Sequence, residues 1–336
     1  MSVLDQSPVP EGCSPGEALR NSIDLARLAE SLGYHRYWVA EHHGSAGIAC
    51  NSPEVLIGPI AAATSTIRVG SGGVMLPHYS PLKVAESFSM LTGLFPSRID
   101  LGIGRAAGTS PVIARALQRD RRQPAPDDFR DQLDELIRYF TIPEPAAGPF
   151  PRPLTARFES PALWLLGSSP QSAVWAAELG MRYVFADFIN PRGAEIARAY
   201  RRDFRPSASL GAPYSGVAAW VICAPADEEA VRLSASLQMM MTLLFRGQTI
   251  AIPSPAKALR FLEEDGQAVE LGSPMRRVIR GAPETVAAQL EALRRDYEAD
   301  EVFAVNILYD HQARRRSYEL LAAAVGTERA ECTSGR

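Results

Sequence analysis

The sequence predicts an α/β protein with a (β/α)8 TIM-barrel fold. Short apolar runs alternate with helical segments along the whole chain, and about eight such βα units can be counted. The 336 residues suit a barrel of about 250 residues with insertions, which we place at about 106–126 and 247–280. A doubly wound open sheet is the alternative, but the first βα turn lacks a glycine-rich fingerprint.

The first half of the chain contains four predicted βα units. Strands are expected at 3–5, 37–40, 67–77 and 99–105, and helices at 14–32, 53–63, 81–94 and 127–139. Ser14 and Glu17 have the spacing of a capping box, and Gly33 is a typical helix terminator. The proline-rich stretch 143–161 is either a linker or a long surface connection.

The second half keeps the same alternation. Strands are expected at 163–167, 182–186, 217–223 and 301–308, and helices begin near 170, 191, 227 and 283, with a last helix running past 317. The stretch 247–280 is broken by prolines and glycines and is expected to be irregular. We therefore predict one domain over 1–325 and a disordered tail over 326–336.

Composition and charge exclude several classes of protein. The chain is 46% apolar, 22% charged and has a net charge of −3, so neither nucleic acid nor an anionic membrane is indicated as a partner. The four cysteines lack CxxC spacing, which argues against a zinc site or a disulfide framework. Without a signal peptide or a long apolar run, a cytoplasmic location is expected.

Glu41, His42 and His43 directly follow the apolar strand at 37–40. A carboxylate and two imidazoles at the carboxyl end of a barrel strand indicate chemistry. The alternative is a helix cap beside a solvated loop. A mononuclear metal site is not expected, because HExxH spacing is absent and adjacent strand residues point to opposite sides.

Three further features follow other strands and are expected to share a pocket with this motif. The turn at 167–172 combines hydroxyls with a helix start, which suits a phosphate, although plain helix capping is an alternative. Arg105 supplies a guanidinium for the same anion, and Gly72-Gly73 indicates a bulge, a flat ligand or a tight barrel corner. The residues expected in the pocket are Glu41, His42, His43, Gly72, Gly73, Arg105, Ser168, Ser169 and Asn306.

Several segments, taken together and in order, resemble the bacterial luciferase-like flavin monooxygenases, in particular their small single-chain members. The matching stretches are RYWVAEHH (36–43), IRVGSGGVMLP (67–77), PLKVAE (81–86), RIDLGIGR (98–105) and WLLGSS (164–169). The resemblance extends from about residue 3 to about residue 322.

The resemblance implies that the barrel binds FMN at its carboxyl-terminal face. It assigns a non-proline cis peptide to Gly72-Gly73, a catalytic role to His42 with Glu41 and His43 beside it, and a mobile lid to 247–280. The positions that it implies for the FMN phosphate, together with the neighbouring turn residue Ser168, are Arg105, Ser168, Ser169 and Ser172.

The implied reaction uses reduced FMN, delivered by a separate NAD(P)H:flavin reductase, and O2. A flavin C4a-peroxide then oxygenates a small organic substrate, and the protein is expected to be a homodimer. Two positions depart from the family pattern: Gly104 replaces the reactive cysteine of luciferase, and Asp187, which is expected to face substrate, stands where relatives show histidine. Alternatives are a deazaflavin- or flavin-dependent hydride-transfer enzyme, a non-catalytic flavin-binding protein, and a structural subunit.

Overall fold

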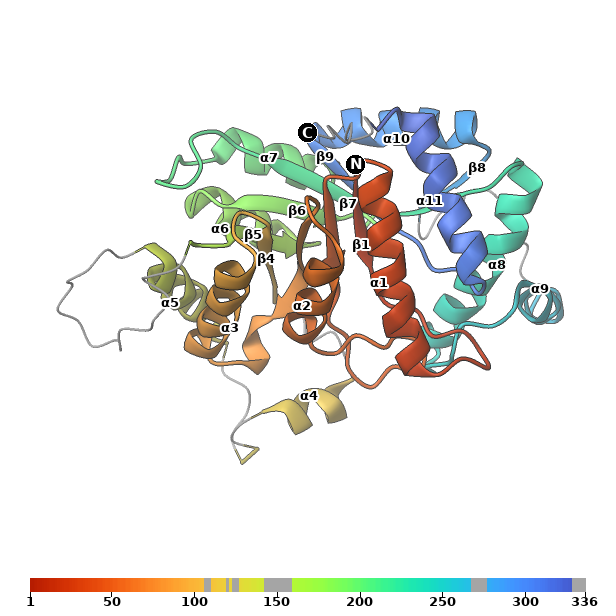
Figure 1. Ribbon diagram of the computed structural model, residues 1–336, viewed down its shortest axis with the longest axis horizontal. Coiled ribbons are helices and arrows are strands. Elements are labelled where there is room, and N and C mark those ends of the chain that lie inside the picture. Colours follow the sequence, from red (N-terminus) through yellow and green to blue (C-terminus); the bar gives the residue numbers. More distant parts are fainter. Residues whose placement is uncertain (106–109, 119–120, 123–126, 142–158, 267–276, 328–336) are drawn as a thin grey trace, which may run out of the picture.

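A computed structural model of the chain describes residues 1–105, 110–118, 121–122, 127–141, 159–266 and 277–327 (Figure 1). The strands are β1 Ser2–Asp5, β2 Arg36–Val39, β3 Arg68–Met75, β4 Ile99–Gly104, β5 Ala162–Gly167, β6 Arg182–Ala186, β7 Ser215–Cys223, β8 Val278–Gly281 and β9 Glu301–Val305. The helices are α1 Pro15–Ser31, α2 Pro53–Ala63, α3 Pro81–Leu94, α4 Pro111–Leu117, α5 Phe129–Thr141, α6 Pro170–Glu178, α7 Ala194–Asp203, α8 Asp227–Phe245, α9 Pro255–Glu264, α10 Pro283–Tyr297 and α11 His311–Val325, with a 3-10 turn, η1, at Leu76–His78.

Eight of the strands close into a parallel barrel, which confirms the predicted fold. Strands β1 to β7 follow one another around the ring, and β9 closes it between β7 and β1. Most helices surround this ring as an outer layer (Figure 1). The ninth strand, β8, continues the sheet along β7 beyond the point where β6 ends.

Local sequence signals set the limits of the helices as predicted. At the start of α1, the Ser14 hydroxyl accepts a hydrogen bond from the Glu17 amide, and the Glu17 carboxylate accepts one from the Ser14 amide at 2.7 Å. Gly33 follows α1 with a φ of 78°, a conformation that glycine adopts without a steric penalty. The capping box and the glycine terminator are therefore confirmed.

Aromatic side chains fill the interior of the barrel. The Trp38 ring lies 5.0 Å from the Trp164 ring and 4.4 Å from the Phe303 ring, centroid to centroid. All three side chains are fully buried. The centre of the barrel is consequently a packed core, as is usual for this fold.

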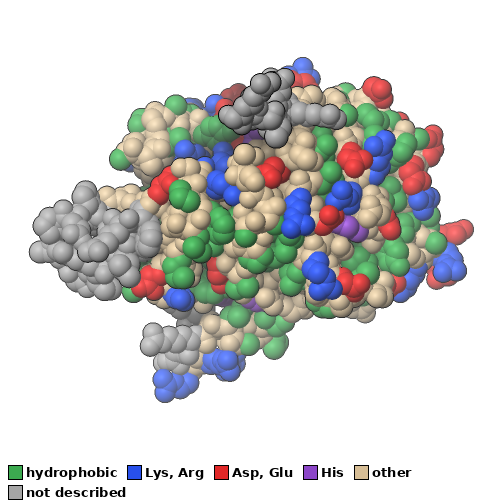
Figure 2. All heavy atoms as spheres, viewed as in Figure 1, with side chains coloured by type: hydrophobic (Ala, Val, Ile, Leu, Met, Phe, Trp, Pro, Cys, Tyr) green, Lys and Arg blue, Asp and Glu red, His purple; other side chains and the backbone are tan. Residues whose placement is uncertain are grey.

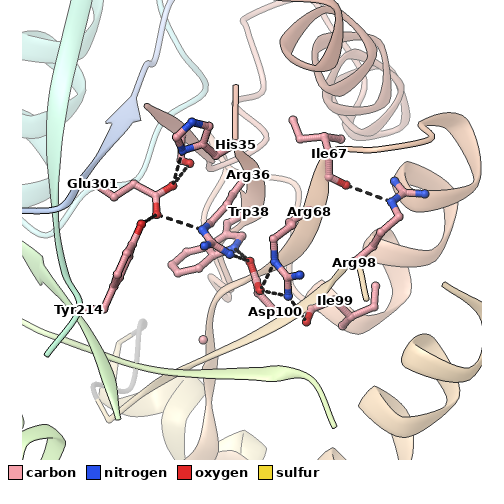
Figure 3. Close-up of polar contacts among 12 residues, drawn as sticks. His35, Arg36, Trp38, Ile67, Arg68, Arg98, Ile99, Asp100, Tyr214 and Glu301 are labelled. Atoms are coloured by element: carbon pink, nitrogen blue, oxygen red, sulfur yellow. Dashed lines mark hydrogen bonds and ion pairs between the residues drawn. The ribbon is translucent and has the colours of Figure 1, made fainter. Parts of the chain in front are cut away.

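A buried ion-pair network closes the amino-terminal end of the barrel (Figure 3). The Asp100 carboxylate accepts hydrogen bonds from Arg36 at 2.8 Å and from Arg68 at 2.9 Å, and also from the Trp38 indole at 2.9 Å. Arg36 also donates to Glu301 at 3.0 Å. These groups satisfy one another, so removing any one of them would leave a charge without its partner. Ligand sites of this fold lie at the opposite, carboxyl-terminal end.

The expectation that 247–280 is irregular throughout is wrong for its described part, which contains α9 and β8. Residue Ile252 is also fixed to the loop after β1: its amide donates to the Val9 carbonyl at 2.8 Å, and its carbonyl accepts from the Glu11 amide at 2.9 Å. The start of this insertion is thus held by backbone hydrogen bonds. Residues 267–276 lie outside the described residues.

The other uncertain stretches of the prediction also fall partly outside the described residues. These are 106–109, 119–120 and 123–126 of the first insertion, 142–158 of the proline-rich stretch, and 328–336 of the tail.

Acidic and basic side chains are interspersed over the face shown in Figure 2. Among the helices that the structure describes, none has the length and apolar character needed to cross a membrane.

Candidate functional site

A cavity of about 250 Å³ opens at the carboxyl-terminal end of the barrel. Each strand from β1 to β7, or the loop directly after it, contributes lining residues, and α5 and α6 add Phe129 and Trp175. Parallel strands present their carboxyl ends to one face, which is where barrel enzymes hold their active sites. The predicted location of the site agrees with this cavity.

The structure brings most of the predicted site residues to this one cavity. Those that line it are His42, Gly72, Gly73, Arg105, Ser168, Ser169 and Ser172. The expectation of a single shared pocket is wrong for three residues that do not line the cavity, Glu41, His43 and Asn306. Asp187, which was expected to face substrate, does not line it either.

Glu41 holds two neighbouring strand ends together. Its side chain is fully buried, and its carboxylate accepts from the Met75 amide at 2.9 Å and from the Tyr79 hydroxyl at 2.9 Å. His43 Nε2 lies 2.7 Å from the same carboxylate. These contacts join the end of β2 to the end of β3 and to η1, so both oxygens of Glu41 are occupied by groups of the protein itself.

His42 points toward the cavity from the same loop. Its amide donates to the Cys50 carbonyl at 3.0 Å, while its Nδ1 is buried without a hydrogen-bond partner among the described residues. Burial, and secondarily the neighbouring His43, lower the pKa of His42 from 6.5 to about 4. The imidazole is therefore neutral near pH 7, and the residue lines the cavity.

The Gly72-Gly73 peptide bond is cis, as the resemblance implies. The β3–β4 register also shifts between Ser71 and Val74, which confirms the bulge. A Cβ on Gly72 would lie 2.3 Å from the Leu4 side chain, and one on Gly73 would lie 2.8 Å from a backbone carbonyl oxygen of β4. At Gly73 the obstacle is backbone, so a side chain there would force the strands apart, whereas at Gly72 the end of the Leu4 side chain would have to move. The two glycines form the wall of the cavity beside β2.

The ends of β4 and β5 combine features that suit an anion. The exposed Arg105 guanidinium lies 5.4 Å from the centre of the Trp175 ring and makes no ion pair or hydrogen bond with the described residues. Ser169 is the N-cap residue of α6, yet its hydroxyl makes no capping hydrogen bond. A guanidinium and a hydroxyl that make no hydrogen bond with the described residues thus lie with a helix start beside one cavity, and these groups can bind an anion.

Ser172 is more constrained than its neighbour Ser169. Its hydroxyl lies 2.7 Å from the Ser169 carbonyl oxygen, to which it donates, and 3.0 Å from the Tyr183 hydroxyl. Gly167 makes room for this hydroxyl, because a Cβ at Gly167 would lie 2.2 Å from it. In this arrangement Ser172 shapes the turn, and its proton is already used within the protein.

Asp187 is turned away from the cavity, contrary to the expectation that it faces substrate. One carboxylate oxygen accepts from the Tyr297 hydroxyl of α10 at 2.8 Å and lies 3.8 Å from Arg277. The other oxygen is buried without a hydrogen-bond partner among the described residues. Burial raises the pKa of Asp187, and its chain neighbours Ala186 and Phe188 line the cavity instead.

Asn306, also expected in the pocket, serves the packing of α11. Its amide group donates to the Val221 carbonyl at 2.9 Å and to the Ser317 hydroxyl at 3.0 Å.

Gln6, by contrast, lines the cavity but was not predicted as a site residue. The missed signal is its place one residue after β1, at the same end of the barrel. The described residues contain no cluster of three or more side chains suited to a metal ion.

The barrel and the position of its cavity define a (β/α)8-barrel protein whose site lies at the carboxyl ends of the strands. A family model described as luciferase-like monooxygenase matches residues 1–300. The chain belongs to the luciferase-like monooxygenase family.

Individual relatives agree with this assignment. The chain is 41% identical over 320 residues to a luciferase-like monooxygenase of Escherichia coli strain K12, covering 95% of each chain. It is 37% identical over 330 residues to the N-acetyl-S-alkylcysteine monooxygenase of Bacillus subtilis strain 168, covering 97% of this chain and 98% of that one. Among solved structures, apo-MsnO8 superposes with a TM-score of 0.90 at 40% identity and covers 98% of this chain and 99% of its own.

Proposed function

We propose that the protein is an FMN-dependent monooxygenase that uses reduced FMN and O2 to oxygenate a small organic substrate. The observation that carries the proposal is the grouping of His42, the Gly72-Gly73 pair and the anion-binding features around Arg105 on the wall of one cavity. Membership of the luciferase-like monooxygenase family supports the same activity.

The described residues fit a flavin mononucleotide in two independent respects. Arg105 and the N-terminal end of α6, with Ser168 and Ser169, would hold the phosphate, since a guanidinium binds phosphate oxygens in a bidentate manner and a helix start favours an anion. The surface of Gly72 and Gly73 carries no side chain and would accept a flat ring. Ser172 would support the turn from behind rather than donate to the phosphate.

Bound reduced FMN would supply the electrons that activate O2. The protein must then handle protons and exclude water. His42 is neutral near pH 7 because burial lowers its pKa to about 4, so it would accept a proton or a hydrogen bond from a group in the cavity. The largely apolar lining, which includes Leu4, Phe188 and Ile189, would limit the access of water.

Glu41 and His43 are predicted beside His42 as catalytic residues. We propose that they are positioning residues, which hold other parts of the site in place. Their contacts fix the loop that carries His42 and the segment that follows the glycine pair. Delivery of reduced FMN by a separate NAD(P)H:flavin reductase, assembly as a homodimer and a cytoplasmic location remain parts of the proposal that derive from the resemblance.

The proposal is tested by loading the purified protein with FMN, reducing it and mixing it with 18O2 and candidate substrates. We expect a true substrate to acquire one 18O atom and to decrease the yield of free hydrogen peroxide. His42→Ala should bind FMN and lose oxygenation. The control His311→Ala, on the outer helix α11, should still bind FMN and oxygenate the substrate. Oxygenation by His42→Ala at the wild-type rate would contradict the role of His42.

Two outcomes would replace the proposed reaction. Product formation that continues after removal of O2 would favour hydride transfer with a flavin or a deazaflavin. Tight binding of flavin without turnover of any candidate would favour a non-catalytic flavin-binding protein.

A further inference from the structure

The geometry points to Gln6 as a specificity-determining residue: we propose that its carboxamide hydrogen-bonds an uncharged oxygen, such as a ketone, ester or amide carbonyl, on the organic substrate. This inference rests on the proposed function, because it assigns a substrate class to the same cavity. Gln6 directly follows β1 and lines the cavity.

The Gln6 side chain is directed to the cavity and has no hydrogen-bond partner among the residues that the structure describes. The residue is only 5% exposed, yet neither carboxamide atom is among the buried side-chain atoms that lack a partner. The small exposed part of the side chain therefore includes the carboxamide, which faces the cavity that Gln6 lines. A carboxamide that is open to a cavity and makes no hydrogen bond with the described residues can bind a polar group of a ligand there.

The backbone on both sides of Gln6 is firmly held. The Asp5 carbonyl accepts from the Ala40 amide at 2.9 Å, and the Ser7 carbonyl accepts from the Ala49 amide at 2.9 Å. The Ser7 amide in turn donates to the Asp5 carboxylate at 2.7 Å. Gln6 is thus presented by a fixed loop, which favours a defined role in recognition over a chance orientation.

The position of Gln6 favours the substrate over the FMN phosphate as its partner. In the closed ring of eight strands, β1 lies four strands from β5 in either direction. The anion-binding features around Ser169 are at the ends of β4 and β5, so Gln6 lies across the cavity from them.

The surroundings of Gln6 define the chemical class. The wall on its side is formed mainly by apolar groups, including Leu4, Ala40 and Ala218. Among the described lining residues, Arg105 is the only one with a permanently charged side chain, and it lies on the far side of the cavity. An anionic or cationic group beside Gln6 would lack a counter-charge, whereas a carbonyl on an apolar body would be satisfied by the carboxamide.

Probe pairs that differ in one acceptor atom test this inference. The pairs are cyclohexanone with methylenecyclohexane and acetophenone with α-methylstyrene, and their binding to the FMN-loaded protein is followed by changes in flavin absorbance. We expect the wild type to bind each ketone about tenfold more tightly than its alkene, the effect of one good hydrogen bond. Gln6→Leu and Gln6→Glu should both remove the preference, and the exposed control Gln312→Leu on α11 should retain it.

The outcomes separate this inference from the proposed function. Failure of the wild type to bind FMN contradicts the proposed function, whatever the probes do. Normal binding of FMN with no preference between ketone and alkene, or with a preference that survives in both Gln6 variants, overturns the role of Gln6. A loss of FMN affinity in Gln6→Glu with an unchanged ketone preference would assign Gln6 to the flavin instead, and would also overturn the proposal.

Discussion

Replacement of Glu41 tests whether this buried carboxylate positions the site or takes part in the chemistry. Its carboxylate accepts hydrogen bonds from the Met75 amide and the Tyr79 hydroxyl and contacts His43. Glu41→Ala leaves at least two donors without their acceptor. At about 1.5 kcal/mol for each hydrogen bond to a charged group, we expect the free energy of unfolding to fall by about 3 kcal/mol.

Glu41→Gln preserves the shape and separates the two roles. The amide oxygen can still accept from the Met75 amide, and the amide nitrogen can donate to the Tyr79 hydroxyl oxygen, so the expected loss is only about 1 kcal/mol. Met75 lines the cavity two residues after the glycine pair, so the affinity for FMN should follow the loss of stability in both variants.

Urea denaturation followed by tryptophan fluorescence measures the stability, and a fluorescence titration measures the affinity for FMN. Glu319→Ala serves as the control, because Glu319 pairs with Arg316 within α11 at the surface and its removal should change the stability by less than about 0.5 kcal/mol. The reasoning is refuted if Glu41→Ala costs less than about 1 kcal/mol. A Glu41→Gln variant with normal stability, normal FMN affinity and no oxygenation would instead make Glu41 catalytic.

Three other perturbations give distinct results. Arg105→Ala should weaken FMN binding about 10- to 100-fold through loss of charge-assisted hydrogen bonds. An equal effect in the surface variant Arg316→Ala would contradict the proposal that Arg105 binds the FMN phosphate. Gly73→Ala would place a Cβ 2.8 Å from a backbone oxygen and should cost about 1–3 kcal/mol in urea denaturation, whereas Gly211→Ala, with open space around it, should be neutral. The folded chain protonates His42 only near pH 4, but the unfolded chain does so near pH 6.5, so stability should fall by at most about 3 kcal/mol as the pH decreases between these values. His42→Phe should flatten that part of the pH profile, and an unchanged profile would show that the imidazole is not buried in its neutral form.

Most of the architecture could be predicted because its signals are local. Ser-Pro helix starts, the capping box of α1 and apolar runs for the eight barrel strands depend on residues close together in the sequence. The inner structure of the second insertion was missed because proline and glycine concealed α9 and β8. The β8 strand is only four residues long, and its pairing with the end of β7 depends on a gap left by β6, which no local pattern records.

The errors at the site have a simpler cause, which is the alternation of side chains along a strand. In the run from Trp38 to His43, every second residue faces the inside of the barrel: Trp38 fills the core, and Ala40 and His42 line the cavity. Glu41 and His43 fall between them and bond elsewhere.

The same rule accounts for Asp187 and for Gln6. On β6, Val184 and Ala186 line the cavity, and Asp187 turns outward to Tyr297. On β1, Leu4 lines the cavity and Asp5 turns outward, which places Gln6 inside. Applied to each strand after its core residue is known, alternation would have rejected Asp187 and selected Gln6. To apply alternation, one residue of each strand must already be known to face the inside of the barrel. The packing of Trp38 against Trp164 and Phe303 identifies such residues, but only in the folded barrel.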